Sequence, residues 1–178
     1  ANSGRPYRVT FINNGTLRVE KQDSRGRWQT LINQQSVSGT NGAIYCEEDV
    51  QVSGTLDGEM TIATKQGKDI IITDDLTYDW PSNHQSVWND SFDPTDPRFN
   101  DKLGLISGRD IVVDVNDNAD VYIMGSFAAI TGSFRNANYT RRPAKTLHLY
   151  GGLAQDRRGA VGTFGRLGAT VRCVHRGA

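Results

Sequence analysis

The sequence is short of long apolar runs, helical periodicity and cysteine. No apolar stretch exceeds about five residues, whereas a membrane-spanning helix needs about 20. Apolar residues do not recur with a 3.6-residue period, so an α-helical protein is excluded. There are two cysteines in 178 residues, a length that can bury a core without disulfides.

The opening ANSGRPYRV has no signal peptide and is typical of a chain cut at a processing boundary. We expect no membrane contact from the fragment itself, with any anchor outside it.

Short β-branched runs, separated by Gly and Asp turns at near-regular spacing, are the main signal in the sequence. Each run has three to five residues and is too short to bury a face unless its neighbours stack on it. The pattern therefore predicts the rungs of a parallel β-solenoid. The runs are Ala43–Cys46, Val50–Val52, Met60–Ala63, Ile70–Thr73, Leu103–Ser107, Asp110–Asp114, Val121–Met124 and Thr146–Tyr150.

Within the first rungs, alternation separates inward from outward side chains, and glycines mark the corners at Gly54, Gly58 and Gly67. The predicted inward residues are Ile44, Val50, Val52, Leu56, Met60, Ile62, Ile70, Ile72 and Leu76. Residues 7–33 contain three further strand-like runs, and Asn14-Gly15 predicts a tight hairpin turn between the first two. They form an antiparallel meander.

The prediction is a mainly-β protein with two regions. Residues 1–42 form the N-terminal meander, and residues 43–164 form the solenoid with a long acidic loop at 81–102. Trp80, Trp88, Phe92 and Phe99 would pack that loop on the flank of the solenoid. The last run, Ala169–Val174, is expected to leave the solenoid, so that residues 165–178 return to the meander and complete a small antiparallel sheet.

Charge is unevenly distributed although the formal net charge is zero. Residues 47–101 hold thirteen acidic residues against three basic ones, and residues 131–178 hold nine basic residues against Asp156 alone. Tyr139 offers a ring for base stacking between the basic residues. The candidate DNA-binding residues are Arg135, Tyr139, Arg141, Arg142, Lys145, Arg157 and Arg158. The alternative is a solvated surface that balances the acidic loop at 89–101.

Several segments together resemble a known family: GAIYCEEDVQVSGTLDGEMTIATKQGKDIIITDDLTY, DKLGLISGRDIVV, ADVYIMGSFAAITGSF and KTLHLYGGLAQDRRGAVGTF. They are similar to the solenoid-bearing domain of bacterial pilin-like and type IV pilus-assembly surface proteins, including competence minor pilins. The resemblance covers roughly residues 7–165, and LYGGLAQDRRGAVGTF is its most specific part. It implies an exported, non-enzymatic protein of the cell surface, pilus or periplasm. Its implied partners are pilin subunits and, for natural transformation, DNA.

Catalytic and metal-binding patterns are weak. Asp74-Asp75 invites a polysaccharide-cleaving interpretation, but adjacent residues on a strand point to opposite faces unless a bulge intervenes. His84, His148 and His175 lie far apart and form no zinc motif. Oxygen ligands in the loop, from Asn89, Asp90, Asp93 and Asp96, suit calcium but miss the EF-hand spacing. We expect no catalytic residue and no cofactor, and a solvated acidic turn is favoured over a calcium site.

Cys46 and Cys173 are either a bridge or two separate buried thiols. In an exported protein an even pair of cysteines indicates a disulfide, and this one would close a loop of more than 100 residues.

The function predicted from sequence is a non-enzymatic, pilus-associated or surface protein that binds DNA non-specifically for uptake. The alternatives are a purely structural or adhesive surface domain and a glycan-active β-helix enzyme.

Overall fold

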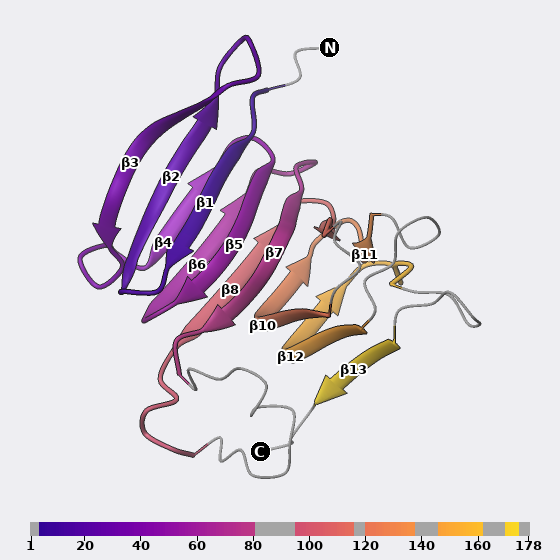
Figure 1. The fold of residues 1–178 in the computed structure, drawn as a ribbon. Coiled ribbons are helices and arrows are strands. Elements are labelled where there is room, and N and C mark those ends of the chain that lie inside the picture. Colours follow the sequence, from indigo (N-terminus) through magenta and orange to yellow (C-terminus); the bar gives the residue numbers. More distant parts are fainter. Residues whose placement is uncertain (1–3, 81–94, 116–119, 138–145, 162–169, 175–178) are drawn as a thin grey trace.

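The structure is a computed structural model of the chain. It describes residues 4–80, 95–115, 120–137 and 146–161 and the backbone of residues 170–174. These residues form one curled, mixed sheet of thirteen strands (Figure 1). The described residues contain no helix, and so none that could cross a membrane. The prediction of a mainly-β chain is confirmed.

The strand bounds follow the predicted runs closely, although several strands are longer than their runs. They are β1 Tyr7–Ile12, β2 Thr16–Gln22, β3 Trp28–Ser36, β4 Ala43–Cys46, β5 Val50–Leu56, β6 Glu59–Thr64, β7 Ile70–Tyr78, β8 Lys102–Ser107, β9 Ile111–Val113, β10 Val121–Ala129, β11 Phe134–Asn136, β12 Thr146–Gln155 and β13 Thr170–Val174.

Strands β1, β2 and β3 form the predicted antiparallel meander. Phe11 lies opposite Leu17 across the first hairpin, and Gly15 at its turn has a φ of 69°. A positive φ is the backbone conformation that the Asn-Gly turn was expected to supply. The pairing of β2 with β3 contains two register shifts, and β3 runs to Ser36.

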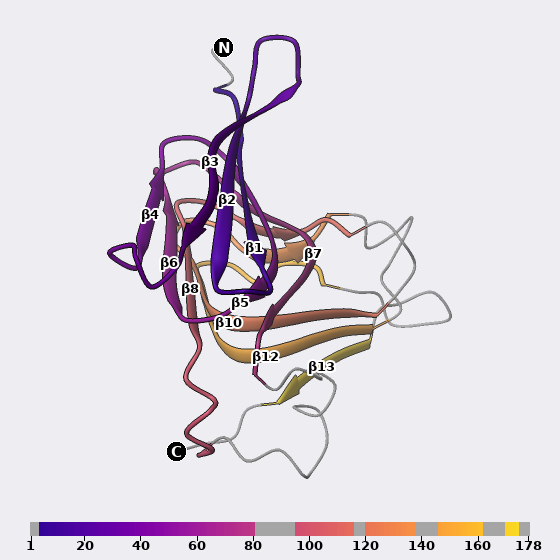
Figure 2. The ribbon, with the colours of Figure 1, turned by 60° about the vertical axis from the view of Figure 1, so that its left-hand side comes forward.

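The remaining strands form two parallel ladders, here called ladder A and ladder B. Ladder A consists of β1, β5, β7, β9 and β11, each pairing in parallel with the next. Ladder B consists of β4, β6, β8, β10, β12 and β13, also parallel throughout. A single pair, Leu76 with Ile123, joins the ladders in the sheet. The sheet bends, so that β4, β6 and β8 lie behind β1, β5 and β7 (Figures 1 and 2).

Inward side chains of successive strands stack in columns. In ladder A, Val9 pairs with Val52 and Val52 with Ile72, and all three side chains are fully buried. In ladder B, Ile62 pairs with Leu105, again with no exposure. Full burial of a Val, Leu or Ile side chain contributes about 1.5–3 kcal/mol. Eight of the nine predicted inward residues are buried and Ile44 is half-buried.

Glycines make the bends where neighbouring backbones come close. Gly54, Gly58 and Gly67 all have positive φ, as predicted for corners. At Gly54 a Cβ atom would lie 2.0 Å from the carbonyl oxygen of Phe11. Any side chain at this position would therefore push β1 away from β5.

The prediction for the last strand is wrong. Strand β13 pairs in parallel with β12, with Leu149 opposite Cys173, and does not reach the meander. The meander has an open edge only at β3, since β1 is paired with β2 and β5, and among the described strands β13 pairs with β12 instead. The open edge of β12 offers the next parallel position, so the antiparallel part of the sheet consists of β1, β2 and β3.

The end of the acidic loop packs on the body as expected. The ring of Phe99 meets Tyr78 and Tyr150 edge-on, at centroid distances of 5.6 and 5.7 Å. Arg98 lies over Trp80, 4.0 Å from the ring centroid. Trp88 and Phe92 lie outside the described residues.

Candidate polyanion-binding surface

The outer face of the meander carries charge because buried and outward residues alternate along the paired parts of β1 and β2. On β1 and β2, Val9 and Val19 point into the core and are buried. Their neighbours Arg8 and Glu20 lie opposite each other on the outer face. Alternation thus turns a basic sequence into a basic surface.

Arg8 is fixed on this face by three partners. Its guanidinium lies 3.9 Å from the centroid of the Trp28 ring, and its Nε donates to Oε1 of Gln51 at 3.1 Å. Its Nη1 lies 3.7 Å from a carboxylate oxygen of Glu20. The contacts hold Trp28 against the sheet as an aromatic surface beside a cation, which is the combination that stacks on nucleic-acid bases.

The β2–β3 hairpin extends beyond the body of the protein (Figures 1 and 2). Asp23 shapes its turn, accepting hydrogen bonds from the amides of Arg25 and Arg27 at 2.8 and 2.9 Å and from Nε of Arg27 at 3.0 Å. These bonds, with that of the Arg27 amide first, lower the pKa of Asp23, while burial opposes them. Because Asp23 is occupied by the turn and by Arg27, it leaves the exposed side chain of Arg25 to solvent.

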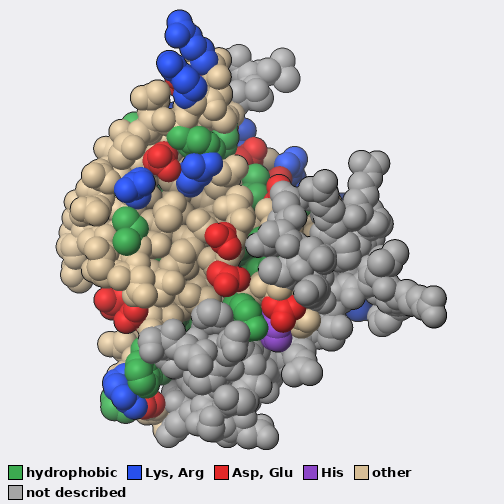
Figure 3. All heavy atoms as spheres, viewed as in Figure 1, with side chains coloured by type: hydrophobic (Ala, Val, Ile, Leu, Met, Phe, Trp, Pro, Cys, Tyr) green, Lys and Arg blue, Asp and Glu red, His purple; other side chains and the backbone are tan. Residues whose placement is uncertain are grey.

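Residues 4–37 hold six basic and two acidic residues. In the space-filling view, Lys and Arg side chains gather at the projecting tip of the hairpin (Figure 3). The basic residues are Arg5, Arg8, Arg18, Lys21, Arg25 and Arg27. Sequence reasoning missed this cluster because it compared longer windows, in which the acids of residues 47–101 dominate. A count over the meander alone would have found it.

The basic residues predicted near the C-terminus are only partly described. Tyr139, Arg141, Arg142 and Lys145 lie outside the described residues. Arg135 donates from Nε to Asp110 at 3.0 Å. Arg157 lies 3.4 Å from Asp156 and donates from Nη2 to the Thr131 carbonyl at 2.9 Å. Arg158 is exposed.

The structure brings Arg135, Arg157 and Arg158 to the same end of ladder A. The Arg157 amide donates to the carbonyl of Gly132 at 3.1 Å, and the Asn136 amide donates to Ala160 at 2.9 Å, so residues 157–160 run alongside 132–136. Two of the three arginines have an aspartate partner. The meander lies at the other end of ladder A, which gives the molecule two basic ends.

The acids between these ends have structural roles that sequence reasoning missed. Three side chains at one corner of ladder A each accept the amide of the next rung. Asp49 accepts from the Asp69 amide at 2.9 Å, Asp69 from the Asp110 amide at 3.0 Å, and Asp110 from the Ser133 amide at 2.9 Å. Each of these aspartates stands directly before a strand, β5, β7 and β9 in turn, and this position was a signal in the sequence.

Asp74 and Asp75 lie where the pairing of β5 with β7 shifts register, between Val52 and Gly54. The bulge that would let both carboxylates face one side is therefore present. Both carboxylates are nevertheless engaged: Asp74 accepts from the Asp75 amide at 2.8 Å, and Asp75 accepts from the Tyr122 amide at 2.9 Å. Asp75 thereby anchors β7 to β10, and Asp74 fixes the local turn of the backbone.

The calcium candidates are described only at Asp96, since Asn89, Asp90 and Asp93 lie outside the described residues. Arg98 binds both carboxylate oxygens of Asp96, at 3.0 and 2.6 Å. Hydrogen bonds from the Arg98 side chain, and then from its amide, lower the pKa of Asp96 to about 2. Among the described residues no three His, Cys, Asp or Glu side chains form a metal-binding group. The guanidinium occupies the position that a cation would take.

Of the three histidines only His148 is described, while His84 and His175 lie outside the described residues. Its ring stacks on Tyr122 at a centroid distance of 4.4 Å, and its Nε2 lies 4.0 Å from a carboxylate oxygen of Asp120. This is a packed inter-strand position between β10 and β12.

Of the two alternatives left open for Cys46 and Cys173, this arrangement favours separate thiols over a bridge. Cys46 is a free, buried thiol, and burial raises its pKa to about 11. It lies on β4, at one end of ladder B, whereas Cys173 lies on β13 at the other end. Five strand spacings of about 4.8 Å separate the two strands, far more than the Cα separation of a disulfide.

Charge and an aromatic ring on one face make the meander a candidate surface for anions, while Asp49, Asp69, Asp75 and Asp110 hold strands together. The geometry brings Arg8 and Trp28 together on this face, beside the basic hairpin tip. The chain matches no known protein family, no curated protein and no solved structure.

Proposed function

We propose that the chain is a non-enzymatic module of an exported surface or pilus-associated protein, and that it binds DNA without sequence preference. The pilus association rests on the sequence resemblance described above. The DNA-binding activity rests on one observation, the basic and aromatic outer face of the meander with its projecting hairpin.

We further propose that ladders A and B are two sides of a parallel solenoid. Consecutive strands alternate between the ladders: β4 in ladder B is followed by β5 in ladder A, then β6 in B and β7 in A. Every pairing within a ladder is parallel. The positive φ angles at Gly54, Gly125 and Gly151 fall inside long strands, where a coil must turn a corner. The meander then closes one end of the coil.

Charge favours the meander over the C-terminal basic end as the main DNA contact. Each end pairs two arginines with acids, Arg8 and Arg27 in the meander and Arg135 and Arg157 at the C-terminal end. The meander also exposes Arg5 and Arg25, whereas the described part of the C-terminal end adds only Arg158. Phosphate contacts supply most of the affinity in non-specific binding, and each phosphate neutralised lowers log K by about 0.9 per tenfold rise in salt. A few contacts therefore predict weak, steeply salt-dependent binding.

The test is fluorescence anisotropy with a labelled DNA duplex at several low salt concentrations. The double variant Arg5→Glu, Arg25→Glu should bind at least about tenfold more weakly than wild type, with a shallower salt slope. Arg157→Glu, Arg158→Glu is the matched control, because it changes the charge equally at the other end of ladder A. This control should retain most of the affinity.

Two results would overturn the proposal. If wild type does not bind duplex DNA at low salt, DNA is not its ligand. If both double variants lose affinity equally, binding follows net charge and the meander is not the site.

A structural or adhesive role is the second candidate, and the outer face of ladder B favours it. On this face, outward residues that pair across β4, β6, β8, β10 and β12 form two columns, and neither column contains a charged residue. Tyr45 and Ile106 in one column are 64% and 41% exposed. The columns are Ala43, Thr61, Gly104, Ser126, Gly152 and Tyr45, Ala63, Ile106, Ala128, Ala154. An uncharged sheet face with exposed apolar side chains suits contact with another protein surface.

A further inference from the structure

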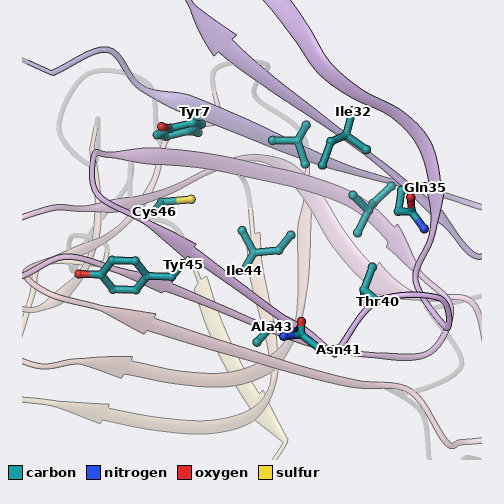
Figure 4. Close-up of a pocket in the computed structure, with 11 residues that line it drawn as sticks. Tyr7, Ile32, Gln35, Thr40, Asn41, Ala43, Ile44, Tyr45 and Cys46 are labelled. Carbon is teal, nitrogen blue, oxygen red and sulfur yellow. Dashed lines mark hydrogen bonds between the residues drawn. The ribbon is translucent and has the colours of Figure 1, made fainter.

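A pocket of about 390 Å³ lies between the meander and β4. Its size falls within the range of small ligand pockets. Figure 4 shows Tyr7 and Ile32 on the meander side and Ile44 and Cys46 on the opposite side, with Gln35, Thr40 and Asn41 at one end. Leu17 and Val19 of β2 complete the apolar lining.

The pocket runs along an edge of the sheet. All four consecutive residues of β4, Ala43 to Cys46, line it. A cavity facing one side of a strand would touch alternate residues only, because successive side chains point to opposite faces. In the described part of the chain β4 pairs on one side only, with β6. The pocket therefore lies at the other edge.

The backbone of β4 presents hydrogen-bonding groups to this space. The carbonyls of Gly42 and Cys46 accept from the amides of Thr61 and Lys65, at 2.8 and 2.9 Å, so the even-numbered residues face β6. Tyr45, at the odd position between them, points its N–H and C=O away from β6. The Ala43 amide is held by Oδ1 of Asn41 at 3.2 Å, which leaves the Tyr45 amide as the available donor within the described residues.

The two ladders also end at different levels. β1 stacks on β5, and β2 and β3 continue beyond it, whereas ladder B ends at β4. Val37, on the connection between β3 and β4, is buried and packs beside Gly58 at the end of the body covered by the meander. Ile32 on β3 remains 43% exposed. One extended strand paired with β4 would extend ladder B by one strand, as β1 extends ladder A beyond β5, and would cover Ile32.

We propose that the free edge of β4 binds an extended segment of a partner protein as an added strand. The segment has apolar side chains at alternate positions, which enter the pocket, and its backbone pairs with Tyr45. Natural edge strands are protected by shortness, charge, proline or covering elements. β4 is short, with four residues, but neither β4 (AIYC) nor β3 (WQTLINQQS) contains a charge or a proline. Exposed Glu47 follows β4 directly, so a Lys or Arg flanks the apolar part of the segment. This proposal is independent of DNA binding.

The probe is a fluorescein-labelled peptide, acetyl-Lys-Thr-Val-Thr-Val-Thr-Lys-amide, titrated with the full chain. Tyr45→Pro should weaken binding about tenfold or more, because it removes the pairing amide. Proline is tolerated on an edge strand where its nitrogen faces outward. Tyr45→Ala keeps the amide and is the control, expected to stay within about threefold of wild type.

A second measurement uses wild-type protein alone, in case Tyr45→Pro does not fold. Two peptides are made, one N-methylated at the odd-numbered amides and the other at the even-numbered amides; these are the two phases. Strand pairing predicts that one phase loses binding and the other keeps it, since only one edge of the peptide faces β4.

The proposal is overturned if wild type does not bind the peptide at millimolar concentration, or if both N-methylated phases bind equally. Sedimentation of the chain without peptide tests a different occupant. A dimer that Tyr45→Pro abolishes would assign the edge to a second copy of the chain and overturn the partner segment.

Discussion

Arg109 binds Asp69 through two hydrogen bonds, from Nε at 2.7 Å and from Nη2 at 2.6 Å. The carboxylate side chain is 9% exposed and the arginine is 51% exposed. Hydrogen bonding to Asp69, together with its charge, raises the pKa of Arg109. The same carboxylate accepts the Asp110 amide, so it joins β7 to the start of β9.

Asp69→Ala should lower the free energy of unfolding by about 2–4 kcal/mol, because it leaves an amide and a half-buried guanidinium without their acceptor. Arg109→Ala should cost about 1 kcal/mol, since the arginine is half exposed and solvent screens the pair. Urea unfolding of both variants measures the difference. Equal losses would contradict the structural role given to the Asp110 amide bond.

Asp110 should make the protein sensitive to acid. Burial raises the pKa of Asp110, but the Ser133 amide and Arg135 together outweigh burial and lower it. The ionised carboxylate is therefore preferred in the folded state, and its contribution is present above the unfolded pKa, near 4, and is lost as pH falls through the lower, folded pKa. Asp110→Asn should be less stable than wild type at pH 7 and lose less stability between pH 5 and 2. Thermal unfolding across this range checks the slope, and parallel curves for the two proteins would count against it.

Gly151 and Gly152 form a matched pair of sites in β12. At Gly151, with φ of 125°, a Cβ would lie 1.8 Å from the carbonyl oxygen of Gly125, whereas at Gly152 nothing lies within 4 Å. Gly151→Ala should destabilise the protein by about 2–4 kcal/mol and Gly152→Ala by less than about 0.5 kcal/mol. Urea unfolding of the two variants compares their stabilities through the unfolding midpoints. Similar midpoints would mean that β10 and β12 do not pair in this register.

Cys46 should be protected from alkylation in the folded protein. It is 4% exposed, and its pKa of about 11 leaves little thiolate at pH 8. We expect iodoacetamide to label Cys46 slowly in the folded protein and fast in urea. Mass spectrometry of the peptide containing Cys46 measures the extent of labelling. A peptide pair linked to Cys173 in an unreduced digest would contradict the separation of β4 and β13.

The local pattern of the fold could be predicted, because a strand alternates its side chains and a tight bend requires glycine. Val50, Val52, Ile70 and Ile72 were assigned to the core from alternation alone, and all four are buried. Gly54 was assigned to a corner for the same kind of reason.

Pairing over distance could not be predicted in the same way. The run ending at Val174 has the same composition whether it joins the open edge of β12 or that of β3 in the meander, so its composition does not say which edge it takes. The choice between a Cys46–Cys173 bridge and two separate thiols was left open for the same reason. The binding surface was missed because alternation was used to find the core, and the outward residues beside it, such as Arg8 and Trp28, were not followed.

The distances between paired strands along the chain have a consequence for how fast the protein folds. In ladder B, Ile44 pairs with Ile62, 18 residues later, but Met60 pairs with Leu103, 43 residues later. Closing the longer loop costs about 0.8 kcal/mol more in chain entropy. The pairing of Tyr7 with Val50 spans the same 43 residues. We therefore expect the docking of β8 on β6 and of β1 on β5 to be the slow steps in strand pairing, and a chain with residues 81–94 replaced by a short turn to dock β8 faster.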